Sequence, residues 1–235
     1  MSSNIANVHV VLVHGAWADG SSWNKVITGL RAKGIASVAA PLPLTTLADD
    51  VAALDRTLER VDAPVVLVGH AYAGAVIAET RSEKVKSLVY VTALAPDEGE
   101  KVIDVFYRTE PHPRAPKLAP DSHGLIYLPH NAFAVAFAPN ATPEEQEQLA
   151  AIQRPIAWPC ISVPVGRPLW KDRPSYFLLA EQDRMIVKET QRFMAERMKA
   201  KVRTHPVDHT PSVTAPGVVV DIILEALRDV FQDAK

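Results

Sequence analysis

The stretch Val65-Val66-Leu67-Val68-Gly69-His70-Ala71-Tyr72-Ala73-Gly74 decides the fold of this chain. It opens with four apolar residues, three of them valine. Such a run is typical of a strand in the middle of a parallel sheet, because helices cover both faces of that sheet. Small residues follow at positions 71, 73, 74 and 75, so a helix can pack closely against the strand after a sharp turn. We expect this turn to lift the side chain of residue 71 above the edge of the sheet.

Short apolar runs alternate with helical patterns over most of the chain. The expected strands are Val8–Val13, Ala36–Ala40, Val65–Val68, Leu88–Val91, Tyr176–Leu179 and Val202–Val207. Between them, apolar residues recur with helical spacing, as from Leu47 to Leu58 and in the last segment after Pro216. The sequence therefore predicts an α/β fold, a doubly wound, mostly parallel six-stranded sheet with right-handed crossovers.

The segment 96–173 interrupts this alternation. It is rich in proline, and it contains a helix start at Thr142, which can cap the helix while Pro143 occupies the first turn and Glu145 reaches back. We expect an insertion of short helices over the sheet and call residues 96–173 the lid segment. The core is then expected to comprise residues 1–95 and 174–235.

The composition excludes several classes of protein. With 235 residues, of which 48% are hydrophobic and 22% charged, the chain is neither disordered nor fibrous. The net charge is -2 and no block of Lys and Arg occurs, so nucleic acid is not expected as a partner. No apolar stretch approaches the ~20 residues that cross a bilayer, so no membrane is expected either. Residues 1–7 are polar and predict no secretory signal, which favours a soluble cytoplasmic protein.

The cysteine and histidine residues give no indication of a metal site. Cys160 is the single cysteine, which excludes an intramolecular disulfide, and we expect it to be buried and inert. His112, His123 and His130 match no metal-ligand spacing, and no carboxylate cluster accompanies them. We therefore expect neither a metal nor a cofactor.

Titratable residues stand at the expected carboxyl ends of the strands, where parallel sheets place their chemistry. Asp183 follows the strand ending at Leu179, and His209 follows the strand ending at Val207. A carboxylate bonded to an imidazole fixes its tautomer and stabilises the charged ring. The pair therefore predicts a general base, His209, held by Asp183, with a purely structural ion pair as the alternative. The neighbouring Asp208 is expected to face solvent.

Position 71 lies where a nucleophilic side chain is expected, but its residue is an alanine. The strand–turn–helix setting matches the G-x-S-x-G pattern of a nucleophile elbow, but Ala71 stands in place of the serine and Ala73 in place of the last glycine. The chain order of Ala71, Asp183 and His209 is that of nucleophile, acid and histidine in such proteins. Because a methyl group cannot attack a substrate, an acyl-enzyme cycle on a serine is excluded.

Three segments resemble the small α/β-hydrolases. They are His14-Gly15-Ala16-Trp17-Ala18-Asp19-Gly20-Ser21-Ser22-Trp23, Val68–Gly74 and Asp183–Ile186. The resemblance covers nearly the whole chain and is closest to the branch with bacterial esterase-like proteins, plant methyl-ester hydrolases and hydroxynitrile lyases. It implies an oxyanion hole that uses the backbone N–H of Tyr72 and an N–H of Ala16 or Trp17.

Other residues near these positions are candidates for contact with a substrate. His14 and His70 are the substrate-binding candidates, although His14 could instead only hydrogen-bond the backbone. The ring of Trp17 is a candidate pocket wall, and whether the Tyr72 hydroxyl reaches a ligand is open. Some lid-segment aromatic residues are expected to line an apolar pocket, while most form the segment's own small core.

Three functions of different class remain open on the sequence. The first is a cofactor-free enzyme that uses His209 and Asp183 as a base on a small, apolar carbonyl or ester compound. The second is a serine esterase disabled by the change to Ala71, and the third is a non-catalytic receptor for a small molecule. The expected partner is a small-molecule substrate in each case, and a homodimer is left open.

Overall fold

The computed structural model describes residues 8–232, and its centre is a six-stranded parallel sheet. The strands are β1 (His9–Val13), β2 (Ala36–Ala40), β3 (Val65–His70), β4 (Val85–Val91), β7 (Ser175–Ala180) and β8 (Lys201–His205). Their order across the sheet is β2-β1-β3-β4-β7-β8, and every neighbouring pair is parallel. The predicted α/β architecture is confirmed.

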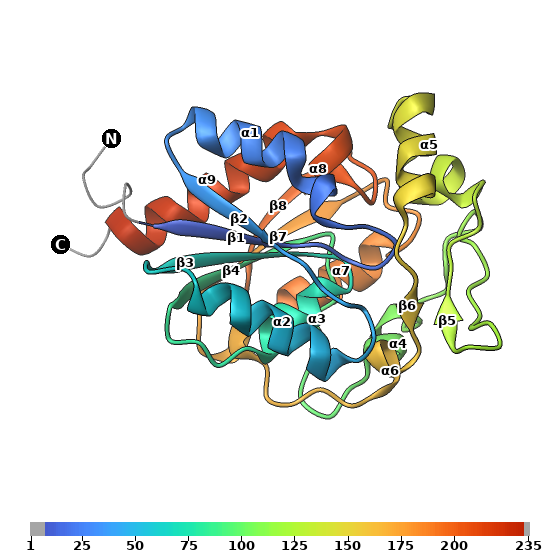
Figure 1. Cartoon of the computed structure of the whole chain (residues 1–235), viewed down its shortest axis with the longest axis horizontal. Coiled ribbons are helices and arrows are strands. Elements are labelled where there is room, and N and C mark those ends of the chain that lie inside the picture. Colours follow the sequence, from blue (N-terminus) through green and yellow to red (C-terminus); the bar gives the residue numbers. More distant parts are fainter. Residues whose placement is uncertain (1–7, 233–235) are drawn as a thin grey trace.

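Helices cover both faces of this sheet (Figure 1). The helices of the core are α1 (Asn24–Ala32), α2 (Leu47–Glu59), α3 (Ala73–Glu79), α7 (Lys188–Arg197), α8 (Pro211–Thr214) and α9 (Pro216–Gln232), with a 3-10 turn η2 (Gly20–Trp23) before α1. Helices α1 and α9 pack on one face, and α2, α3 and α7 pack on the other.

The alternation of side chains along the strands explains this double layer. In β1, Val10 and Leu12 are buried in the cluster that includes α9, whereas Val11 and Val13 are buried in the cluster on the opposite face. Successive residues of a strand point to opposite faces, so an unbroken valine-rich run is stable only with apolar cover on both sides.

Several predicted boundaries differ from the structure. Strand β8 ends at His205, two residues earlier than expected, and its Val202 is 46% exposed because β8 lies at the edge of the sheet. Strand β3 continues to His70, and helix α3 begins at Ala73 because the intervening residues form the sharp turn.

The lid segment lies beyond the sheet, to its right in Figure 1. Its elements are α4 (Val102–Phe106), β5 (Leu125–Ile126), η3 (Phe133–Phe137, a π-helix), α5 (Pro143–Ile152), β6 (Ile156–Ala157), α6 (Pro159–Ser162) and η4 (Leu169–Lys171). Thr142 and Glu145 form the predicted capping box at the start of α5. The small antiparallel pair of β5 and β6 was not expected from the sequence.

Within residues 8–232, no helix has both the length and the apolar character needed to span a bilayer. Residues 1–7, on which the expectation of no secretory signal rests, lie outside the described part of the chain.

Candidate active site

The turn between β3 and α3 holds Ala71 in a backbone conformation that few side-chain-bearing residues adopt. Its φ is +49°, in the left-handed region, which costs about 1–2 kcal/mol for a residue other than glycine. Hydrogen bonds compensate for this cost, since the Ala71 carbonyl accepts from the N–H groups of Leu94 (2.9 Å) and Gly74 (3.1 Å). A side chain at Gly74 would lie 2.2 Å from the Leu94 carbonyl oxygen, so glycine is required for this approach.

Two backbone amides beside Ala71 are the candidate donors to a developing oxyanion. Tyr72 and Ala16 both line the cavity described below. The loop bearing Ala16 can approach the turn because Gly15 has no side chain. A Cβ atom at this position would lie 2.9 Å from the His70 carbonyl oxygen. The expectation that Trp17 could be the second donor is wrong, because its backbone N–H already donates to the Arg154 carbonyl (2.9 Å).

His209 and Asp183 come together as the sequence predicts. His209 Nδ1 lies 2.9 Å from Asp183 Oδ2, and both side chains are buried. The other carboxylate oxygen of Asp183 accepts the N–H groups of Met185 (2.7 Å) and Ile186 (2.9 Å). A carboxylate oxygen accepts hydrogen bonds, so Nδ1 of His209 is the donor in this contact. In the neutral form of this tautomer, the second ring nitrogen, Nε2, is an acceptor.

The backbone of His209 is held by His70 and Thr92. The His209 carbonyl accepts from His70 Nε2 (2.7 Å) and from Thr92 Oγ1 (3.0 Å). Burial, reinforced by repulsion from His209, lowers the pKa of His70 to about 3. His70 therefore remains neutral at ordinary pH and donates one fixed hydrogen bond.

His14 and His70, the two histidines expected to contact the substrate, do not line the cavity. His14 is fully buried, accepts the Leu42 N–H at Nε2 (3.1 Å) and lies 2.9 Å from the Gly15 carbonyl through Nδ1. Its pKa is lowered, chiefly by burial. The substrate-binding role expected for His14 and His70 is thus replaced by a backbone-holding role, because both ring nitrogens of His14 and Nε2 of His70 contact main-chain groups.

Asp208 corrects another expectation, because it is fully buried and does not face solvent. Its carboxylate accepts the N–H of Asn140 (2.9 Å), the N–H of Thr210 (3.1 Å) and the hydroxyl of Thr214 (2.7 Å). Asn140 belongs to the lid segment, so Asp208 ties that segment to the loop that carries His209.

Two residues that the sequence analysis missed support the histidine. Gln191 is fully buried, and its Nε2 donates to Asp183 Oδ2 (3.0 Å) and to the Ile186 carbonyl (2.7 Å). The ring of Phe137 lies 5.3 Å from the His209 ring, centre to centre. A polar residue on the apolar face of α7 was a detectable signal for Gln191, whereas nothing local distinguishes Phe137 from other lid-segment aromatics.

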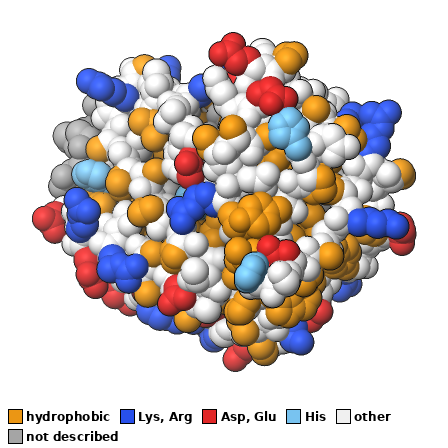
Figure 2. All heavy atoms as spheres, turned by 45° about the vertical axis from the view of Figure 1, so that its right-hand side comes forward, with side chains coloured by type: hydrophobic (Ala, Val, Ile, Leu, Met, Phe, Trp, Pro, Cys, Tyr) orange, Lys and Arg blue, Asp and Glu red, His pale blue; other side chains and the backbone are white. Residues whose placement is uncertain are grey.

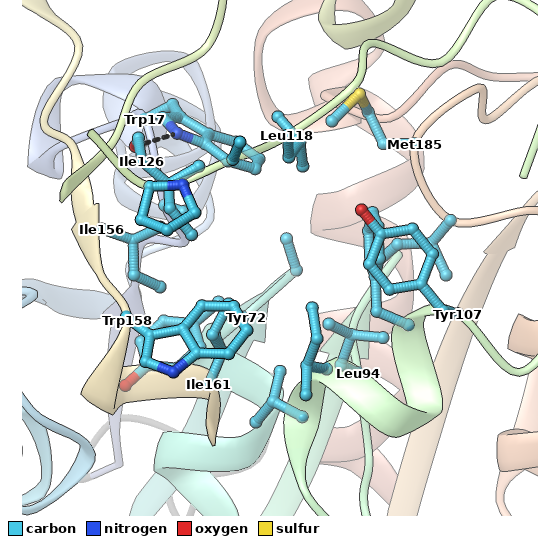
Figure 3. A pocket seen from close by; sticks show the side chains of 18 of the residues that line it. Trp17, Tyr72, Leu94, Tyr107, Leu118, Ile126, Ile156, Trp158, Ile161 and Met185 are labelled. Atoms are coloured by element: carbon cyan, nitrogen blue, oxygen red, sulfur yellow. Dashed lines mark hydrogen bonds between the residues drawn. The ribbon is translucent and has the colours of Figure 1, made fainter. Parts of the chain in front are cut away.

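The candidate groups face a single apolar cavity of about 310 Å³. Ala16, Ala71, Tyr72 and His209 contribute its deep end, and most of the other lining residues come from the lid segment. In Figure 3 the aliphatic and aromatic side chains converge on the cavity, and Trp17 Nε1 donates to the Ile126 carbonyl (2.9 Å). None of the described lining residues is Lys, Arg, Asp or Glu. The cavity therefore suits an apolar ligand with few polar atoms.

The Tyr72 hydroxyl is used by a buried cluster. It donates to Asp50 Oδ2 (2.7 Å), which also lies 3.7 Å from Cys160 Sγ. Burial raises the pKa of Asp50, and burial together with Asp50 raises the pKa of Cys160 to about 12. Cys160 is buried, as predicted, and a thiol with such a pKa is a poor nucleophile at neutral pH. In the described part of the chain, no group of three His, Cys, Asp or Glu side chains could hold a metal ion.

Comparison with known proteins places the fold. Residues 10–222 match the model of the alpha/beta hydrolase family, and the chain belongs to that family. A probable hydrolase, R7, from the fungus Phoma sp. is 24% identical over 92% of this chain and 96% of its own length. Polyneuridine aldehyde esterase is a similar solved structure (TM-score 0.82, 20% identity, 94% of this chain and 99% of that chain). A variant of tomato methylketone synthase I, complexed with β-ketoheptanoate, is similar too (TM-score 0.80, 18% identity, 95% and 99%).

Proposed function

We propose that this α/β-hydrolase is an enzyme that acts on a small apolar carbonyl or ester compound through a His209–Asp183 base, without a serine nucleophile. The observation that carries the proposal is the 2.9 Å contact between His209 Nδ1 and Asp183 Oδ2, with His209 lining the same cavity as Ala71. A receptor would need no such oriented base at the deep end of its pocket.

The proposed chemistry is a proton transfer with charge stabilisation. His209 Nε2 takes a proton from the substrate, or from a water molecule that attacks the carbonyl carbon. Negative charge develops on the carbonyl oxygen, where the N–H groups of Tyr72 and Ala16 donate hydrogen bonds. Asp183 stabilises the imidazolium until His209 returns the proton to the product.

Two features support catalysis without a serine. The apolar lining of the cavity strengthens electrostatic interactions within it, because few polar side chains compete there. Binding and oxyanion stabilisation alone retain about 10³–10⁴-fold acceleration when a triad residue is removed from a serine protease. β-Ketoheptanoate, the ligand named for the tomato structure, is a carbonyl compound with an apolar chain and belongs to the class proposed here.

A panel of esters, β-keto acids and other carbonyl compounds tests the proposal. The native chain should turn over at least one of them, and His209→Ala should lower that rate on the order of 10²–10⁴-fold. His123→Ala is the matched control, since this exposed histidine does not line the cavity and its loss should leave the rate unchanged. Equal turnover by the native chain and His209→Ala would refute the proposal.

A disabled serine esterase is the second candidate, and the left-handed turn at Ala71 favours it. That turn has a shape that would present a serine hydroxyl to the base. Ala71→Ser should then hydrolyse short aryl esters. If it does, while the native chain turns over nothing in the panel, the second candidate replaces the first. If neither protein shows turnover and His209→Ala still binds ligands as tightly as the native chain, the pocket is that of a receptor.

A further inference from the structure

The cavity changes in exposure from one end to the other. At the deep end, Ala71 is 7% exposed and His209 1% exposed. Two other lining residues, Tyr107 and Trp158, are 44% and 43% exposed, and both belong to the lid segment. The cavity therefore runs from the candidate base to a mouth that Tyr107 and Trp158 flank, and Figure 3 shows these two rings on opposite sides of it.

The walls between the two ends are hydrocarbon. Leu94, Ile156 and Ile161 are typical of them, and no lining residue in the described chain carries an obligatory charge. A cavity of about 310 Å³ lies at the small end of the range of ligand-binding pockets, so it suits a small ligand. A polar or charged tail would lose its hydration along this path without gaining partners.

The lid segment carries several exposed apolar side chains. Tyr107, Tyr127, Val135, Ile152, Trp158 and Val163 are large hydrophobic residues that are exposed, and all lie in the lid segment. Figure 2 shows hydrophobic side chains gathered on the face that carries this segment. Atoms of a ligand that extend beyond the cavity can still contact the rings of Tyr107 and Trp158, which line it.

We infer that the substrate is an acyl compound with one carbonyl head and an apolar chain, whose end passes between Tyr107 and Trp158. The inference rests on the proposed function only in placing the carbonyl head beside His209. The chain length is then determined by the distance from the base to the two aromatic residues, so these residues set the specificity of the enzyme.

Calorimetric binding of straight-chain methyl ketones of increasing length tests the inference without requiring turnover. Each added methylene should tighten binding about fourfold while the chain still extends along the cavity, and the gain should level off once the chain reaches the mouth. Tyr107→Ala and Trp158→Ala should each weaken the longest ketones on the order of tenfold and leave the shortest ones within about twofold. Tyr107→Phe, which keeps the ring, should bind like the native chain.

Tyr127→Ala is the matched control, because Tyr127 is a similarly exposed lid-segment tyrosine that does not line the cavity. Affinity that does not depend on chain length would overturn the inference, as would equal losses in Tyr107→Ala and Tyr127→Ala. The β-keto acid and the methyl ester of the best chain length form two further arms, which show whether an acid or an ester head is preferred. Binding that depends on chain length, without any turnover, would sustain this inference and refute the proposed function. Turnover at a rate independent of chain length would sustain the proposed function and refute this inference.

Discussion

The substitution Asp183→Asn tests whether the carboxylate determines which nitrogen of His209 carries the proton. Asp183 accepts four N–H donors: two backbone amides on Oδ1, and His209 Nδ1 with Gln191 Nε2 on Oδ2. A carboxamide has one acceptor oxygen, so it can keep the backbone pair while its NH₂ group faces two other donors. Two donors would then face each other between residue 183 and His209. This repulsion is relieved if the His209 proton moves from Nδ1 to Nε2.

The size of the effect follows from these contacts. With Nε2 protonated, His209 can no longer act as a base, and the rate should fall on the order of 10²–10⁴-fold. Gln191 keeps its bond to the Ile186 carbonyl, so the loss of stability is limited to the charge-assisted hydrogen bonds to Oδ2, about 2 kcal/mol. Turnover, thermal unfolding and the ¹⁵N chemical shifts of the His209 ring measure the three effects separately.

Asp208→Asn is the matched control for this prediction. Asp208 is also a buried carboxylate with several donors and sits next to His209 in sequence, but none of its hydrogen bonds reaches the ring. Its amide should lower stability by a similar amount and leave the His209 tautomer unchanged. An Asp183→Asn protein with the native tautomer and native turnover would refute the proposed role of the acid.

Three further predictions concern the groups around the site. Because His70 has a pKa of about 3 in the folded state against 6.5 in the unfolded one, only the unfolded chain gains its proton as the pH falls. The free energy of unfolding should therefore drop by about 2 kcal/mol between about pH 6.5 and about pH 5, and urea titrations of His70→Gln should show a smaller drop. Gln191→Glu should act in the opposite direction: the new carboxyl lies against Asp183, its folded pKa is raised, and urea titrations should show stability lost as the pH rises above about 4.3. Tyr72→Phe should lower the free energy of unfolding by about 1 kcal/mol, because the hydrogen bond to Asp50 is lost, and should leave methyl ketone affinity unchanged. A weaker affinity would show that the hydroxyl contacts the ligand and not only Asp50.

Much of the fold could be predicted because its signals are local. A run such as Val65–Val68 is apolar at every position, and only a strand with cover on both faces buries it fully. Parallel strands place all their carboxyl ends at one edge, so Ala71, Asp183 and His209 could be expected near one another from their positions after three strands. The capping box of Thr142 and Glu145 is likewise contained within four consecutive residues.

The remaining features depend on contacts between distant parts of the chain. Trp17 bonds the Ile126 carbonyl 109 residues away, and its amide is occupied by Arg154 of the lid segment, which removes it from the candidate oxyanion donors. His70 bonds the His209 carbonyl across 139 residues, which turns a candidate substrate contact into a support for the base.

The sequence by itself therefore determined the layers of the fold and the edge at which its polar residues meet, because apolar periodicity and strand direction follow from the local order of residues. Only the tertiary structure decided that the Trp17 amide is occupied, that Asp208 is buried, and where the cavity opens. These features depend on how the lid segment packs over the sheet, and no local pattern encodes a partner that lies far away in the sequence.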